Sequence, residues 1–100
     1  MKNTEYSLRY LPLARQDISE IDEYLSSFYP STAAKFFAEF QKHLKTLISA
    51  PEVGEVYGQY RRLVVQKYLV FYKVNHEEQA VDVYRVLRGS IDVEKQIVRE

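Results

Sequence analysis

The stretch from Tyr60 to Asn75, which reads YRRLVVQKYLVFYKVN, constrains the fold of this chain most strongly. Large apolar side chains alternate with polar ones along it, and a period of two places successive side chains on opposite faces of a β-sheet. It contains four basic residues and no acidic one. It therefore predicts a basic β-hairpin. After a turn-like segment at 75–79, the sequence AVDVYRVL from Ala80 to Leu87 predicts a further strand.

The composition favours one compact domain over residues 1–100, because 46% of the residues are hydrophobic and only three are glycine and three proline. A formal net charge of zero argues against a general nucleic-acid binder. No cysteine is present, and His43 and His76 alone do not make a metal site, so we expect neither metal nor cofactor. The absence of a long apolar run indicates no membrane partner and a cytoplasmic protein.

The N-terminal half predicts a strand followed by an amphipathic helix. The strand is expected at Tyr6 to Leu11 and is stopped by Pro12. A proline is tolerated at the start of a helix, so the helix can begin there. From Leu13 onward, apolar residues recur at intervals of three and four, which places them on one helical face. That face comprises Ala14, Ile18, Ile21, Leu25 and Phe28. The polar residues Arg15, Asp17, Glu20 and Asp22 are expected to point away from it.

A second helix is predicted after the break at Tyr29-Pro30, with Ser31 or Thr32 as its cap. It should end at Ala50, because the residue before a proline disfavours the helical conformation. Its apolar stripe has the same spacing and comprises Ala33, Phe36, Phe37, Phe40, Leu44, Leu47 and Ile48.

These elements predict an α+β fold with two layers, in the order β-α-α-β-β-β. The short connection at Pro30 makes the helices an antiparallel hairpin, and residues 51–59 form a loop that leads into the sheet. The hairpin should pack on one face of an antiparallel-rich sheet. Six residues are expected in the core: Ile18, Ile21, Leu25, Phe37, Phe40 and Leu44.

The order of these elements, together with RRLVVQKYLVFYKV and VDVYRVLRGSID, resembles the RelE/ParE superfamily of bacterial toxins. The resemblance covers nearly the whole chain, including the helical ISEIDEYL region, an arginine before the aromatic KYLVFYKV strand, and a final VYRVLRG strand. It implies a small toxin of a type II toxin-antitoxin system, kept silent by a cognate antitoxin. Family members divide into ribosome-dependent endonucleases of messenger RNA and proteins that resemble gyrase poisons.

The chemistry of RNA cleavage helps to choose between these branches. Cleavage by the 2′-hydroxyl needs a base, an acid, and cations for the charge that builds on the phosphate. In the nuclease branch an arginine usually occupies the position of Leu69, and a tyrosine or histidine commonly lies near the C-terminus, where IDVEKQIVRE has neither. The VLRGSID ending is similar to ParE, with Arg88 before glycine, although Ile91 occupies the usual position of an arginine. The resemblance therefore favours a toxin that binds DNA gyrase over one that cleaves messenger RNA on the ribosome, and a diverged inactive relative is the remaining alternative.

The candidate target- or phosphate-binding residues are Arg61, Arg62, Arg85 and Arg88, with Lys67, Tyr68 and Tyr72 as weaker candidates. No catalytic residue is assigned. Each candidate also has a structural interpretation: charges at positions 61 and 62 discourage edge-to-edge aggregation, and the tyrosines pack as half-buried sheet residues. Arg85, in the middle of a strand, is expected to need Asp82, Asp92 or a helix carboxylate as partner.

Overall fold

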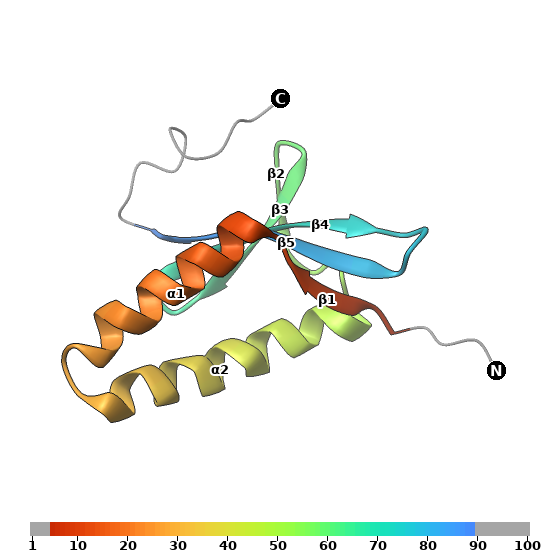
Figure 1. The fold of residues 1–100 in the computed structure, drawn as a ribbon. Coiled ribbons are helices and arrows are strands. Elements are labelled where there is room, and N and C mark those ends of the chain that lie inside the picture. Colours follow the sequence, from red (N-terminus) through yellow and green to blue (C-terminus); the bar gives the residue numbers. More distant parts are fainter. Residues whose placement is uncertain (1–4, 90–100) are drawn as a thin grey trace.

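The computed structural model describes residues 5–89 and has two helices on one face of a five-stranded sheet (Figure 1). The strands are β1 (Ser7–Tyr10), β2 (Glu55–Tyr57), β3 (Tyr60–Val65), β4 (Tyr68–Asn75) and β5 (Ala80–Arg88). The helices are α1 (Pro12–Ser26) and α2 (Pro30–Ser49). The sheet order is β1-β5-β4-β3-β2, in which β1 runs parallel to β5 and the other pairs are antiparallel. The predicted two-layer α+β fold is confirmed.

The short strand β2 corrects the prediction of a loop over residues 51–59. Three residues are too few to show an alternating pattern, and β2 exists because it pairs antiparallel with β3. Gly58 has a φ of 61°, a conformation that glycine adopts readily, and it allows the tight turn that pairs Tyr57 with Tyr60. In Figure 1 this β2–β3 hairpin rises on the side of the sheet away from the helices.

Both helices begin with a proline at the first helical position, where a missing N–H costs no hydrogen bond. For α2 the capping residue is Tyr29, without a side-chain hydrogen bond, so the predicted cap at Ser31 or Thr32 was wrong. The predicted end at Ala50 is confirmed, because Ala50 caps the last turn. Neither helix, within the described part of the chain, is long and apolar enough to span a membrane.

The core lies between the helices and the sheet. Of the six residues predicted for it, Ile21, Phe40 and Leu44 are buried, and Ile18, Leu25 and Phe37 pack against the core while partly exposed. Phe28 was also expected on the buried face, but α1 ends at Ser26 and Phe28 lies in the connection, 57% exposed.

Asp17 requires the opposite correction, because it was expected to face away from the core and is only 9% exposed. It lies three residues after Ala14 and four before Ile21, which are both buried. The helical repeat therefore places Asp17 within the buried stripe of α1. That stripe faces β5, so the carboxylate needs a partner on that strand.

A second, smaller cluster covers the sheet face away from the helices, which we call the outer face. Its buried members are Tyr60, Phe71 and Leu87, and Tyr57, Leu69 and Tyr84 pack against them. The predicted alternation left open which set of β3 and β4 side chains is buried, and the structure buries members of both sets. Val70 and Tyr72 face the helices, whereas Leu69 and Phe71 lie on the outer face.

A β-bulge interrupts the pairing of β4 with β5. Phe71 pairs with Arg85 and the next residue, Tyr72, pairs with Val83, so Tyr84 is the extra residue on β5. The alternation of side chains along β5 is reset there, which explains why Val83 and Val86, three residues apart, both belong to the core under the helices. Two positions further along, Arg88 comes to lie on the same side as Val86.

Tyr72 offers a test of how the loop before β2 is held. Its buried hydroxyl accepts a hydrogen bond from the Gly54 N–H at 2.9 Å, and burial raises the pKa of Tyr72. Replacing Tyr72 by phenylalanine leaves this N–H without its acceptor, so we expect the free energy of unfolding in urea to fall by about 1 to 3 kcal/mol. Tyr29→Phe is the control, since Tyr29 is 71% exposed. Equal stabilities of the two variants would contradict this role.

Candidate functional site

The two predicted arginines of β3 both hold β2 and the loop before it. The Arg61 Nη1 donates hydrogen bonds to the carbonyl oxygens of Glu52, at 3.1 Å, and Gly54, at 2.8 Å. The Arg62 Nη2 lies 3.1 Å from the Glu55 carboxylate, and its guanidinium carbon lies 5.0 Å from the centre of the Tyr57 ring. Both guanidinium groups are therefore engaged within the fold.

Arg85 is paired with a helix carboxylate, one of the three partners considered from the sequence. Its Nε and Nη2 donate to the two carboxylate oxygens of Asp17, at 2.7 Å and 2.9 Å, and this interaction raises the pKa of the Arg85 guanidinium. Asp82 instead pairs with Arg9, and Asp92 lies outside the described residues. A two-point ion pair of this kind has a fixed geometry. Arg85 therefore links β5 to α1.

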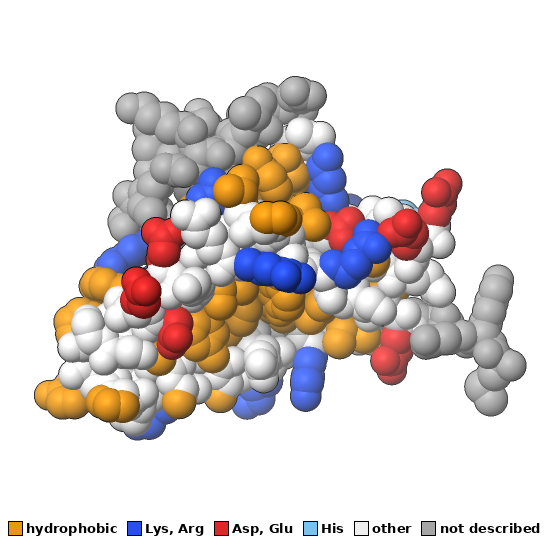
Figure 2. Space-filling view, viewed as in Figure 1, with side chains coloured by type: hydrophobic (Ala, Val, Ile, Leu, Met, Phe, Trp, Pro, Cys, Tyr) orange, Lys and Arg blue, Asp and Glu red, His pale blue; other side chains and the backbone are white. Residues whose placement is uncertain are grey.

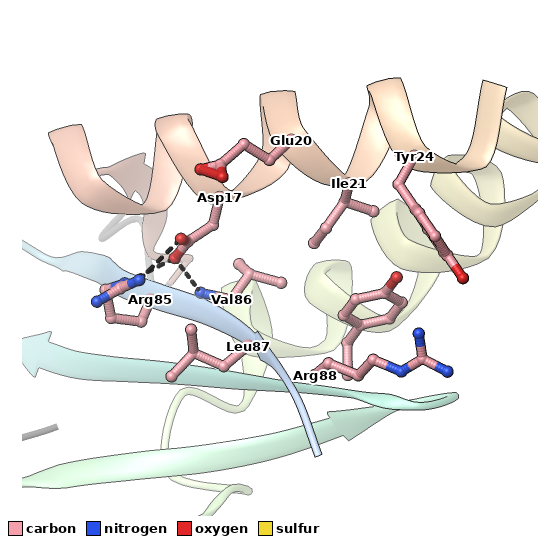
Figure 3. Close-up of a pocket in the computed structure, with 9 residues that line it drawn as sticks. Asp17, Glu20, Ile21, Tyr24, Arg85, Val86, Leu87 and Arg88 are labelled. Atoms are coloured by element: carbon pink, nitrogen blue, oxygen red, sulfur yellow. Dashed lines mark hydrogen bonds and ion pairs between the residues drawn. The ribbon is translucent and has the colours of Figure 1, made fainter. Parts of the chain in front are cut away.

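Arg88 differs from the other three arginines, because no carboxylate among residues 5–89 pairs with it. Its guanidinium carbon lies 6.0 Å from the centre of the Tyr24 ring on α1. Figure 3 shows the guanidinium of Arg88 directed toward Tyr24, at the opposite end of the pocket from the Asp17–Arg85 pair. No side chain of residues 5–89 therefore forms an ion pair with the guanidinium of Arg88.

Two adjoining spaces meet at Arg88. One is a cavity of about 350 Å³ between α1 and the end of β5, and the other is a groove of about 760 Å³ along the start of α2. We call them together the Arg88 groove, since both are lined by Tyr24, Tyr68 and Arg88. Hydrophobic side chains gather at the nearby end of the helical hairpin (Figure 2), where Phe28 is exposed. The groove therefore combines accessible aromatic rings with a cation that has no carboxylate partner among residues 5–89.

The weaker candidates are divided between this groove and the core. Lys67 is exposed on the turn between β3 and β4, and its carbonyl accepts a hydrogen bond from the Gly89 N–H at 2.9 Å. Tyr68 is 8% exposed at the floor of the groove. Its pKa is raised by burial, and the nearby Arg88 offsets only part of that rise. Tyr72 is fully buried. The structure thus brings together Arg88, Lys67 and Tyr68, and it separates them from Arg61 and Tyr72.

The outer face has a different chemistry. The rings of Tyr60 and Tyr84 stack in parallel with their centres 4.8 Å apart, and the Lys73 ammonium lies 5.0 Å from the centre of the Tyr60 ring. Leu69 pairs with Leu87 in the register of β4 and β5 and packs against this cluster. The position that bears an arginine in the nuclease branch is therefore part of an apolar surface.

Two residues of the site were missed from the sequence. Asp17 was assigned to the polar face of α1, and Tyr24 was not considered, although the interval of seven residues between them places both on one face of α1. The available signal was a carboxylate inside an apolar stripe, since such a group is buried only with a partner. Among the described residues, no three His, Cys, Asp or Glu side chains cluster as metal ligands.

Residues 8–93 match the model of the family described as ParE toxin of type II toxin-antitoxin system, parDE. The chain belongs to this toxin family. No curated protein matches its sequence. The sequence-based identification of a RelE/ParE superfamily toxin is thereby confirmed.

Two solved structures show the same fold as this ParE-family chain. One is the chromosomal ParDE toxin-antitoxin system from P. aeruginosa, with a TM-score of 0.68 and 20% sequence identity. The match covers 86% of this chain and 98% of the matched chain. The other is the toxin-antitoxin complex RelBE2 from Mycobacterium tuberculosis, with a TM-score of 0.62 and 21% sequence identity. The match covers 84% of this chain and 98% of the matched chain. Both are structures of toxin-antitoxin systems.

Proposed function

We propose that this ParE-family toxin arrests bacterial growth by binding a protein target, DNA gyrase in the first instance, through the Arg88 groove. The observation that carries the proposal is the state of the four predicted arginines, of which only Arg88 lacks a carboxylate or backbone partner among residues 5–89. Arginine beside exposed aromatic rings is typical of the residues that dominate the binding energy of protein interfaces.

The outer face supports binding over cleavage. An endonuclease needs cations where charge builds on the phosphate, together with groups that transfer protons. In the outer cluster of the described sheet, Leu69 and Leu87 are apolar. The cations that contact its rings are Arg62, over Tyr57, and Lys73, over Tyr60. Leu69 therefore gives no charge to stabilise a phosphate at the position where the nuclease branch carries its arginine.

A cognate antitoxin is the second partner that we propose. Both similar structures are of toxin-antitoxin systems, and the Arg88 groove has the apolar floor that an amphipathic helix or an extended segment needs. Lys35, Lys67 and Arg88 supply positive charge along it, with Glu39 the acidic residue that lines the same space. A segment that presents both apolar and acidic side chains fits this distribution.

Ribosome-dependent cleavage of messenger RNA is the alternative function. One observation favours it: the stacked Tyr60 and Tyr84 with Lys73 on the outer face combine aromatic rings and a cation, the groups that hold single-stranded nucleic acid. These rings stack on each other, so a base must compete with an existing contact.

Purified protein, freed from its antitoxin, decides between the two functions. We expect it to block supercoiling by DNA gyrase and to leave ribosome-bound messenger RNA uncut. Codon-associated cuts in the message, with gyrase activity unchanged, would transfer the function to the nuclease. Expression in bacteria without antitoxin should arrest growth, and co-expression of an adjacent small antitoxin gene should relieve the arrest. Normal growth under strong expression would contradict both functions.

A further inference from the structure

The edge of β5 that does not pair with β4 is only half covered by β1. The parallel pairing runs from Ser7 opposite Ala80 to Tyr10 opposite Val83, and a last hydrogen bond joins the Leu11 N–H to the Val83 carbonyl at 3.0 Å. The chain then turns into α1 at Pro12. From Tyr84 to Arg88 no strand of the described chain pairs with this edge. A backbone N–H that points outward there needs another acceptor.

Asp17 supplies that acceptor. Its Oδ2 accepts a hydrogen bond from the backbone N–H of Val86 at 2.9 Å while the same carboxylate holds Arg85. One side chain of α1 thus occupies the place of a strand at the free edge of β5 (Figure 3). Because Val86 lies two residues before Arg88 and on the same side of the strand, this bond acts directly on the segment that carries Arg88.

The opposite edge of this segment is held as well. Tyr68 pairs with Arg88 across β4 and β5, and the Gly89 N–H donates to the Lys67 carbonyl. On α1, Ile21 and Tyr24 follow Asp17 at intervals of four and seven residues, so all three face the cavity, which Figure 3 shows. Asp17 therefore joins α1 to β5 at one end of the cavity, and Tyr24 meets Arg88 at the other.

We propose that Asp17 is a positioning residue for target binding: by holding the Val86 N–H, it fixes the separation of α1 from the end of β5 and thereby the placement of Arg88 against Tyr24. The proposal rests on the function proposed above for the Arg88 groove. It predicts that the backbone bond, and not the ion pair with Arg85, is the contact on which toxicity depends.

The main test removes the ion pair without leaving a buried charge alone. In the double variant Asp17→Leu, Arg85→Leu, two apolar side chains replace the pair, an exchange that is often neutral for stability, but Val86 has no acceptor. We expect a melting temperature below that of the wild type, because the buried Val86 N–H loses its acceptor. At a temperature where the variant is folded, we expect at least tenfold more surviving colonies after induction at equal soluble protein. Wild-type killing by a folded double variant would overturn the proposal.

The variant Asp17→Asn separates the backbone hydrogen bond from the ion pair. Its amide oxygen still accepts the Val86 N–H, whereas the charge that Arg85 needs is lost. We expect a lower melting temperature with near-wild-type killing at a temperature where the variant is folded. A folded Asp17→Asn protein that kills at least tenfold less, while its Val86 amide stays protected, would overturn the proposal. Asp22→Asn, an exposed change on the same helix, is the control.

Two measurements on purified protein are independent of toxicity. Hydrogen exchange of the Val86 amide should accelerate at least tenfold in the double variant and stay near the wild-type rate in Asp17→Asn. The NMR shift of the Arg88 side-chain N–H, which senses the Tyr24 ring, should change only in the double variant. An unchanged Arg88 signal in the double variant would overturn the proposal, whereas a wild-type protein that does not arrest growth would instead contradict the proposed function.

Discussion

Replacing Arg88 by alanine should abolish toxicity or reduce it strongly and leave the fold unchanged. The side chain has no carboxylate partner among the described residues, so its removal leaves no buried charge unpaired, and we expect the melting temperature to stay within about 2 °C of the wild type. Truncating an arginine at the centre of an interface typically costs about 2 to 4 kcal/mol of binding free energy. The affinity for the target should therefore fall by roughly 30-fold to 1,000-fold.

Arg88→Lys separates the charge of this residue from its shape. Lysine keeps the positive charge and loses the planar group that lies over Tyr24 and donates in two directions. An intermediate toxicity is expected if both properties contribute. Lys45→Ala, an exposed change on α2, should behave as the wild type. Antitoxin binding, measured by calorimetry, should be largely retained, because the apolar floor of the groove and the charges of Lys35 and Lys67 remain for the antitoxin segment. Full toxicity of a wild-type-like Arg88→Ala protein would remove Arg88 from the site.

The sequence predicts the layers of this fold well because hydrophobic periodicity is a local property. The spacing of Ile21, Phe40 and Leu44 specifies which helical faces are buried, and Pro12 and Pro30 mark the helix starts through their own backbone chemistry. The strand β2 escapes this reasoning, since three residues contain no usable period and the strand is defined by its pairing with β3.

The site was harder to predict because it depends on contacts between distant parts of the chain. A strict period of two from Val81 and Val83 would place Arg88 on the outer face, beside Leu69. The bulge at Tyr84 reverses this assignment and brings Arg88 under α1. A bulge has no sequence signature in this strand. Asp17 was likewise assigned by its own polarity, whereas its burial depends on Arg85, which lies 68 residues away.

Arg85→Ala should lower the melting temperature strongly, in contrast to Arg88→Ala, although the two arginines are only three residues apart. The Arg85 and Asp17 side chains are 15% and 9% exposed, and truncation leaves the Asp17 carboxylate buried with only the Val86 N–H as partner. Breaking such a pair costs about 3 to 5 kcal/mol. For a domain of this size, each kcal/mol lowers the melting temperature by about 4 to 8 °C, so a fall of at least 12 °C is expected.

The Arg85→Leu, Asp17→Leu double variant provides the check, because its stability should recover much of this loss once the unpaired carboxylate is removed with its partner. Thermal melting of the two single alanine variants then assigns each arginine: a large fall for Arg85→Ala and none for Arg88→Ala places the first in the fold and the second in the interface. If Arg85→Ala melts like the wild type, the Asp17 carboxylate reaches solvent when its partner is lost, and the link between α1 and β5 is weaker than its geometry indicates.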